Sequence, residues 1–176
     1  MFGRRGLGVV LSSLALLGTS VLTAPAAQAH DGPIGCTGQA STTYSPGLTL
    51  TPRPIGVSED IVYRCADAPG HLTAARSHIV GESPDGTCVA FHNISAREVV
   101  TFGDGTTSEI EYPTGRATRV LGVNTVRLEG IVVSGRGEGG HAERVMQVTP
   151  SGTPADCLTS GGITASTGQV RLTILP

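Results

Sequence analysis

The longest regular pattern of apolar and polar positions lies between Leu121 and Pro150. Two β-rich runs flank a glycine cluster at residues 135–140, and apolar side chains recur at every second position, as on a half-buried strand. Folding the segment about Gly137 aligns three apolar pairs on one face: Val126 with Val148, Leu128 with Met146, and Val132 with Ala142. The other face carries mostly polar residues: Arg127, Glu129, His141, Glu143 and Gln147, with Ile131, Val133 and Val145 among them. An isolated hairpin is unstable in water, so we expect another sheet to cover the apolar face.

The glycine cluster itself matches the pattern G-x-G-x-x-G. A dinucleotide site needs a helix after this pattern, because the helix N-terminus binds the pyrophosphate. Here a strand pattern follows, and Glu138 would repel phosphate. The cluster is therefore interpreted as a hairpin turn.

Other short β-rich runs are separated by turn residues, at 41–51, 56–64, 71–80, 87–94 and 170–175. Residues 97–112 predict a hairpin with a type I′ turn at Asp104-Gly105, which places Val99 opposite Ile110 but also Glu98 opposite Glu111, an unfavourable pair. Helical periodicity is weak, and only residues 66–76 suit a single helical turn. We expect an all-β fold, an immunoglobulin-like β-sandwich of about eight short antiparallel strands.

The first 29 residues have the pattern of a secretory signal peptide. Arg4 and Arg5 precede an apolar run, and Ala27-Gln28-Ala29 supplies the small residues of a cleavage site. Export by the general or by the twin-arginine route is left open. Residues 30–176 are expected to form a single extracellular domain with no membrane span.

The charge of the chain bears on its possible partners, and its cysteine content bears on its disulfides. The exported chain would keep 10 arginines against 14 acidic residues, a formal charge of −4, and it has no lysine, which argues against nucleic acid as a partner. Four cysteines in an oxidising compartment predict two disulfides. A fold-back between residues 41–50 and 57–64 would bring Cys36 to Cys65, which leaves Cys88 to pair with Cys157.

The stretch from Cys36 to Arg53, CTGQASTTYSPGLTLTPR, resembles a family of small secreted actinobacterial proteins of unassigned function. Members of that family continue with a second cysteine at the end of the next strand, here Cys65. They also have a Gly-rich hairpin like residues 129–144 and a late cysteine before a Gly-Thr-rich final strand, here 157–175. The resemblance implies a β fold and export, and it implies no catalytic residue.

No nucleophile elbow or zinc-protease motif is present in the sequence. Three pairs of carboxylates could serve as acid and base, but they are interpreted as solvated side chains: Glu59 with Asp60, Glu109 with Glu111, and Glu129 with Glu143. With no Trp and three Tyr, the chain is poor in the aromatic platforms of sugar-cleaving enzymes. The favoured hypothesis is a non-enzymatic protein that has a structural role or binds an unknown extracellular or cell-wall partner.

A copper site is the alternative. Cleavage after Ala29 would leave His30 at the N-terminus, where its amine and imidazole could bind Cu(II) together with a second histidine. Such a site resembles that of the lytic polysaccharide monooxygenases, although Asp31 follows where that family has glycine. The candidate second ligands are His71, His78, His92 and His141.

Overall fold

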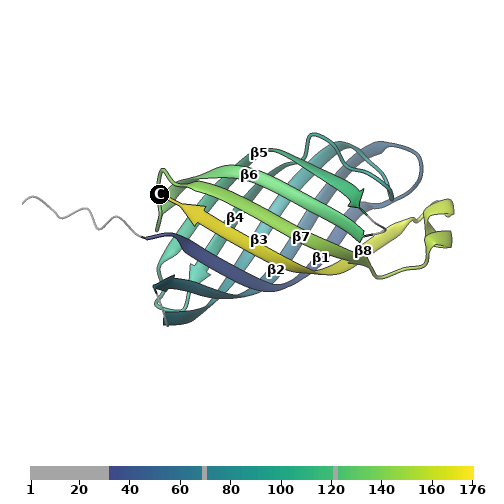
Figure 1. Cartoon of the computed structure of the whole chain (residues 1–176). Coiled ribbons are helices and arrows are strands. Elements are labelled where there is room, and N and C mark those ends of the chain that lie inside the picture. The colour runs from purple at the N-terminus through teal and green to yellow at the C-terminus, as the bar shows by residue number, and fades with distance from the viewer. Residues whose placement is uncertain (1–31, 69–70, 121–122) are drawn as a thin grey trace, which may run out of the picture.

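The computed structural model describes residues 32–68, 71–120 and 123–176 (Figure 1). The predicted signal peptide, residues 1–29, lies outside the described residues, as does His30. The described chain contains eight strands and one short 3₁₀-helix: β1 Ile34–Leu48, β2 Arg53–Ala68, β3 His71–Gly86, β4 Ser95–Phe102, β5 Thr107–Val120, β6 Val123–Gly135, β7 His141–Pro150, η1 Pro154–Leu158 and β8 Ile163–Leu175.

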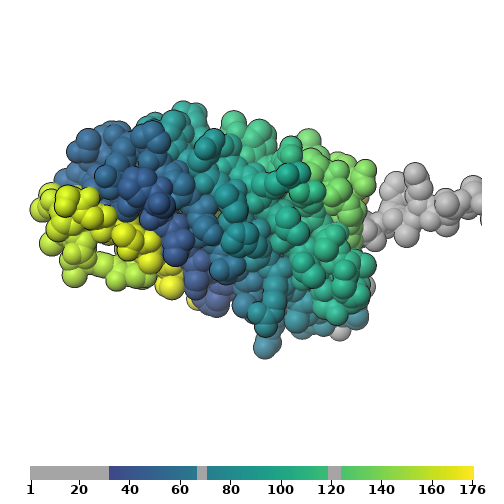
Figure 2. All heavy atoms as spheres, turned by 180° about the vertical axis from the view of Figure 1, so that it is seen from behind, coloured from purple at the N-terminus to yellow at the C-terminus, as the bar shows by residue number. Residues whose placement is uncertain are grey.

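The strands form a closed antiparallel barrel in simple chain order. Each strand pairs with the next, and β1 pairs with β8 to close the sheet. The prediction of an all-β fold is confirmed, but the immunoglobulin-like β-sandwich is wrong. Alternating side chains give each strand one apolar face in either architecture, so the pattern did not distinguish a sandwich from a barrel. Seen from behind, the side chains of the blue to green strands form a continuous outer wall (Figure 2).

The β6–β7 hairpin has the predicted faces but not the predicted register. Val126 pairs with Met146 and Leu128 with Arg144, two residues from the predicted alignment. Because side chains alternate with a period of two, this shift leaves the apolar face intact. The predicted face is largely buried, with exposed fractions of 2% for Leu128, 1% for Val132 and 2% for Met146. The glycine cluster forms the turn, with positive φ at Gly135, Gly137 and Gly139.

The β4–β5 hairpin differs from its prediction by one residue. Glu98 lies opposite Ile110 instead of Glu111, so the unfavourable pair of glutamates does not form. The turn is longer than a type I′ turn: the Phe102 N–H donates to the Thr106 carbonyl, and φ is positive at Gly105 but not at Asp104.

Two other local predictions are wrong. Residues 87–94 form no strand, apart from an isolated bridge between Phe91 and Ala117. The described part of 66–76 belongs to β2 and β3 and has no helical turn, whereas the 3₁₀-helix η1 lies in the connection between β7 and β8. In the described ranges no helix is long and apolar enough to cross a membrane.

Both predicted disulfides are present. Cys36 and Cys65 face each other across β1 and β2 inside the barrel, with Cα atoms 4.0 Å apart. Cys88 and Cys157 join the 87–94 segment to η1, with Cα atoms 6.2 Å apart. This segment covers one end of the barrel: the Cys88 N–H donates to Thr49, and the Phe91 carbonyl accepts from Ala117 on β5. We call residues 87–94 the cap. Two disulfides suit an oxidising compartment.

Candidate functional site

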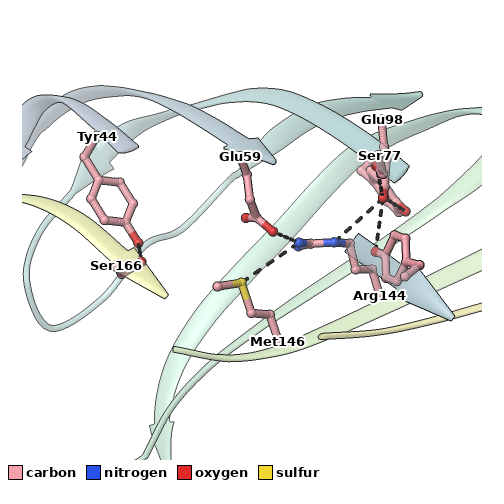
Figure 3. A network of polar contacts seen from close by, with 9 residues as sticks. Tyr44, Glu59, Ser77, Glu98, Arg144, Met146 and Ser166 are labelled. Atoms are coloured by element: carbon pink, nitrogen blue, oxygen red, sulfur yellow. Dashed lines mark hydrogen bonds and ion pairs between the residues drawn. The ribbon is translucent and has the colours of Figure 1, made fainter. Parts of the chain in front are cut away.

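An arginine lies inside the barrel. Arg144 is on the inward face of β7 between Ala142 and Met146, and its side chain is 2% exposed. It extends between two carboxylates from other strands (Figure 3). Arg144 Nη2 donates to Glu59 Oε1 on β2, and Nε lies 3.8 Å from Glu98 Oε2 on β4. A buried charge is tolerated when it is paired and hydrogen-bonded, and this arrangement supplies both conditions.

Glu98 is held by three hydroxyl groups. Its Oε1 accepts hydrogen bonds from Ser77 Oγ at 2.6 Å and from Tyr63 Oη at 3.1 Å. Its Oε2 accepts one from Tyr112 Oη at 2.7 Å. The three hydroxyl donors come from β2, β3 and β5, and the carboxylate itself comes from β4. We call Arg144, Glu59, Glu98, Tyr63, Tyr112 and Ser77 the charge cluster.

Two glycines make room for the two tyrosines. Gly38 lies opposite Tyr63, and a Cβ built on it would lie 2.4 Å from the Val62 carbonyl oxygen and 2.8 Å from the Tyr63 ring. A Cβ on Gly130 would lie 2.8 Å from the ring of Tyr112. Each ring packs over the bare backbone of the adjacent strand, where glycine permits close approach. The charge cluster therefore requires glycine at positions 38 and 130, where a side chain would collide with the tyrosine rings.

Burial sets the protonation of the cluster. It raises the pKa of Tyr63 and of Tyr112 well above 10, with nearby Glu98 acting in the same direction, so both phenols remain neutral donors. It also raises the pKa of Glu59 above 4.5, although Arg144 opposes the shift. Burial alone would lower the pKa of Arg144, but the carboxylates of Glu59 and Glu98 more than compensate, and the guanidinium stays charged. The charged and hydroxyl groups of the cluster are thus hydrogen-bonded to one another, as is typical of a structural or binding site.

A cavity of about 50 Å³ lies between the charge cluster and the cap. Its walls are mostly apolar, and its polar lining comes from Thr42, Tyr44, Glu59 and Arg144. Among the described residues, the buried Thr42 Oγ1 and Arg144 Nε have no hydrogen-bond partner. Unsatisfied buried polar atoms cost free energy, so each marks a place where a ligand or a water molecule could be bound. A cavity needs about 10–15 Å³ to hold one water molecule, so this cavity has room for a group of a few non-hydrogen atoms.

A second cavity, of about 40 Å³, lies directly under the cap. Tyr44, Phe91, Val126 and Val148 line both cavities, so side chains alone separate them. Tyr44 is held by a 2.7 Å hydrogen bond to Ser166, and its ring centroid lies 6.0 Å from that of Phe91 on the cap. Burial raises the pKa of Tyr44 to about 12, so the hydroxyl is neutral. The two cavities therefore meet at the Tyr44 and Phe91 side chains.

The structure corrects one interpretation of the carboxylates. Glu59 is 4% exposed and pairs with Arg144, so the prediction of a solvated side chain is wrong for this residue. Its neighbour Asp60 points outward, where it contacts His78 at 2.8 Å. The other two pairs lie on the outer surface and share arginines: Arg97 contacts Glu109 and Glu111, and Arg127 contacts Glu129 and Glu143.

Sequence reasoning missed Arg144 and Glu98. Arg144 lies two residues from Ala142 and from Met146, so the strand period places it on the apolar face of the β6–β7 hairpin. A charged residue at an inward position was the available signal. Glu98 gave a weaker signal, because the predicted register paired it with Glu111 and its inward orientation was not visible.

The described histidines do not gather into a site. His71 and His141 begin β3 and β7, His78 lies on the outer wall, and His92 lies in the cap. Across residues 32–68, 71–120 and 123–176, no group of three or more metal-ligating side chains comes together. The copper hypothesis depends on His30, outside these ranges, and stays a prediction.

In comparisons with known proteins, no family model, no curated protein and no solved structure matched the chain. The fold and site define it as an eight-stranded up-and-down barrel with a charged interior.

Proposed function

We propose that this is an exported, non-enzymatic binding protein, and that its barrel holds a small, mainly apolar molecule with one hydrogen-bonding group. The observation that carries the proposal is the cavity in which Thr42 Oγ1 and Arg144 Nε lack partners. Barrels of eight strands have an interior just wide enough for packed side chains or for one small ligand. Small-molecule sites in proteins are likewise mostly apolar with a few fixed polar groups.

The two unpartnered atoms indicate the polar group of the ligand. Arg144 Nε can only donate, and Thr42 Oγ1 can donate and accept. A hydroxyl or carbonyl oxygen could accept a hydrogen bond from Arg144 Nε, and a hydroxyl could bond to Thr42 Oγ1. A carboxylate would be a third one at this site and is not favoured, because Glu59 and Glu98 already surround the guanidinium. The apolar part of the ligand would contact side chains such as Val126, Leu128 and Ile79.

The cap offers the route of entry. Phe91 on the cap and Tyr44 on β1 separate the inner cavity from the outer one. The Cys88–Cys157 disulfide ties the cap to η1, so any opening of the cap would leave it attached to the β7–β8 connection. The size of the two cavities favours molecules of a few carbon atoms.

Straight-chain alcohols of four to eight carbons are suitable probes, with the corresponding alkanes for comparison. We expect 1-hexanol to shift the amide resonances of cavity-lining residues in NMR spectra, and to do so at lower concentration than hexane. Ala96→Leu, which fills the cavity, should abolish the shifts. The matched control is Val99→Leu on the outer face of β4, where Val99 is 41% exposed. Equal responses from both variants would contradict binding in the barrel.

A further inference from the structure

A second feature lies on the outside of the barrel, on strands β2, β1, β8, β7 and β6. Arg64 lies opposite Thr37, which lies opposite Arg171, and Arg171 is joined through Val145 to Arg127. An arginine thus recurs on every second strand, at intervals of roughly 10 Å, because neighbouring strands are about 4.8 Å apart. All three arginines are exposed.

A row of glutamines runs beside the arginines. Gln169 lies opposite both Gln39 and Gln147, and each glutamine is two residues from a position in the arginine row. Side chains two residues apart on a strand point to the same side, so both rows face solvent together. We call Arg64, Arg127, Arg171, Gln39, Gln147 and Gln169 the arginine–glutamine surface. These six residues line a groove of about 900 Å³, on the side where β7, β8 and β1 face the viewer in Figure 1.

The charge of this surface is opposite to that of the whole chain, which is −2. Arg127 is paired with Glu143 at 2.7 Å. Among the described residues, no carboxylate lies within ion-pair distance of Arg64 or Arg171, and both guanidinium groups remain open to a ligand. A local positive surface on a negative protein attracts and orients anions.

The side-chain chemistry narrows the class of anion. A guanidinium binds carboxylate or phosphate with two parallel hydrogen bonds, and a glutamine amide both donates to and accepts from hydroxyl groups. Single-stranded nucleic acid is usually bound with aromatic rings that stack on the bases. No aromatic side chain lines this groove. The groove equally lacks aromatic platforms for neutral sugars, so recognition would depend on the arginines and glutamines. This combination fits an extended chain that carries both anionic groups and many hydroxyls.

We propose that the arginine–glutamine surface binds an anionic polysaccharide. The acidic groups of the polymer pair with Arg64 and Arg171, and its hydroxyls bond to the glutamines. Arg64 and Arg171 are two strand spacings apart, roughly 10 Å along the sheet, so the surface engages more than one sugar unit at once. This site is separate from the cavity inside the barrel, and either can exist without the other.

The test uses polygalacturonate as the anionic probe, with dextran as the neutral polymer, in affinity gel electrophoresis and calorimetry. We expect the protein to bind polygalacturonate at low ionic strength, to bind dextran far more weakly, and to lose affinity as salt screens the charges. The Arg64→Gln/Arg171→Gln variant should bind about tenfold more weakly, because each exposed charge pair contributes a few-fold.

A matched control separates a site from a general charge effect. Arg171→Gln and Arg97→Gln remove the same charge, but Arg97 lies on β4 and is paired with Glu109. Only Arg171→Gln should weaken binding, and circular dichroism should show the same melting temperature for both. The proposal is overturned if the protein does not retain polygalacturonate, if the two variants bind equally, or if a single-stranded oligonucleotide of equal charge binds more tightly.

Discussion

Replacing Arg144 with methionine would remove the cation between Glu59 and Glu98 while keeping an unbranched side chain of similar length. Both carboxylates are almost fully buried, with side-chain exposures of 5% and 0%. Breaking a buried ion pair from one side costs about 3–5 kcal/mol, because the remaining charge has no partner. The free energy of unfolding of a domain is about 5–15 kcal/mol in total, so the variant should be close to unfolding at neutral pH.

The loss should depend on pH, and the sign follows from Glu59. Burial already raises its pKa above 4.5, and Arg144 opposes that shift, so removing Arg144 raises the pKa further. A group that binds its proton more tightly in the folded state destabilises the fold as pH rises from the unfolded pKa through the folded one. We therefore expect the cost of Arg144→Met to be smaller at pH 4.5 than at pH 7.

The assay is urea unfolding at both pH values with the disulfides intact, and Arg127→Met is the matched control. Arg127 lies on the same hairpin, but its side chain is 48% exposed and pairs with Glu143 at the surface. Exposed pairs are worth about 0–1 kcal/mol, so this variant should lose little at either pH. Similar losses for the two variants, or a larger loss for Arg144→Met at pH 4.5 than at pH 7, would refute the reasoning.

Two further predictions test the faces of the hairpin and the titration of Glu59. Leu128→Ala should cost about 2–4 kcal/mol, since Leu128 is 2% exposed, whereas Arg127→Ala should cost less than about 1 kcal/mol; the opposite order in urea unfolding would place the faces wrongly. Glu59→Gln removes a group whose pKa burial raises, so the stability of the unsubstituted protein relative to this variant should fall as pH rises above about 4.5. A constant difference between the two across pH 4–8 would show that Glu59 titrates normally.

The sequence by itself determined the all-β class, the faces of the central hairpin and the Cys36–Cys65 disulfide, with Cys88–Cys157 left by elimination. These follow from local rules: side chains alternate along a strand, glycines mark turns, and a hairpin brings its two ends together. The Cys36–Cys65 pairing could be predicted because Cys36 and Cys65 lie at the outer ends of strands that fold back on each other. The predicted register of the β6–β7 hairpin was wrong by two residues, but the predicted faces were correct because side chains alternate with a period of two.

Tertiary structure alone decided the closure of the barrel and the partners inside it. Closure depends on β1 meeting β8, the two ends of the sheet, and no local pattern in either strand specifies that pairing. The same closure brings Arg144 from β7 to Glu59 from β2 and Glu98 from β4. In the sequence Glu59 and Glu98 resemble ordinary surface charges, and Arg144 differs only in lying on the apolar face of its strand. Only the enclosed interior, where a charge requires a partner, turns the three into one cluster.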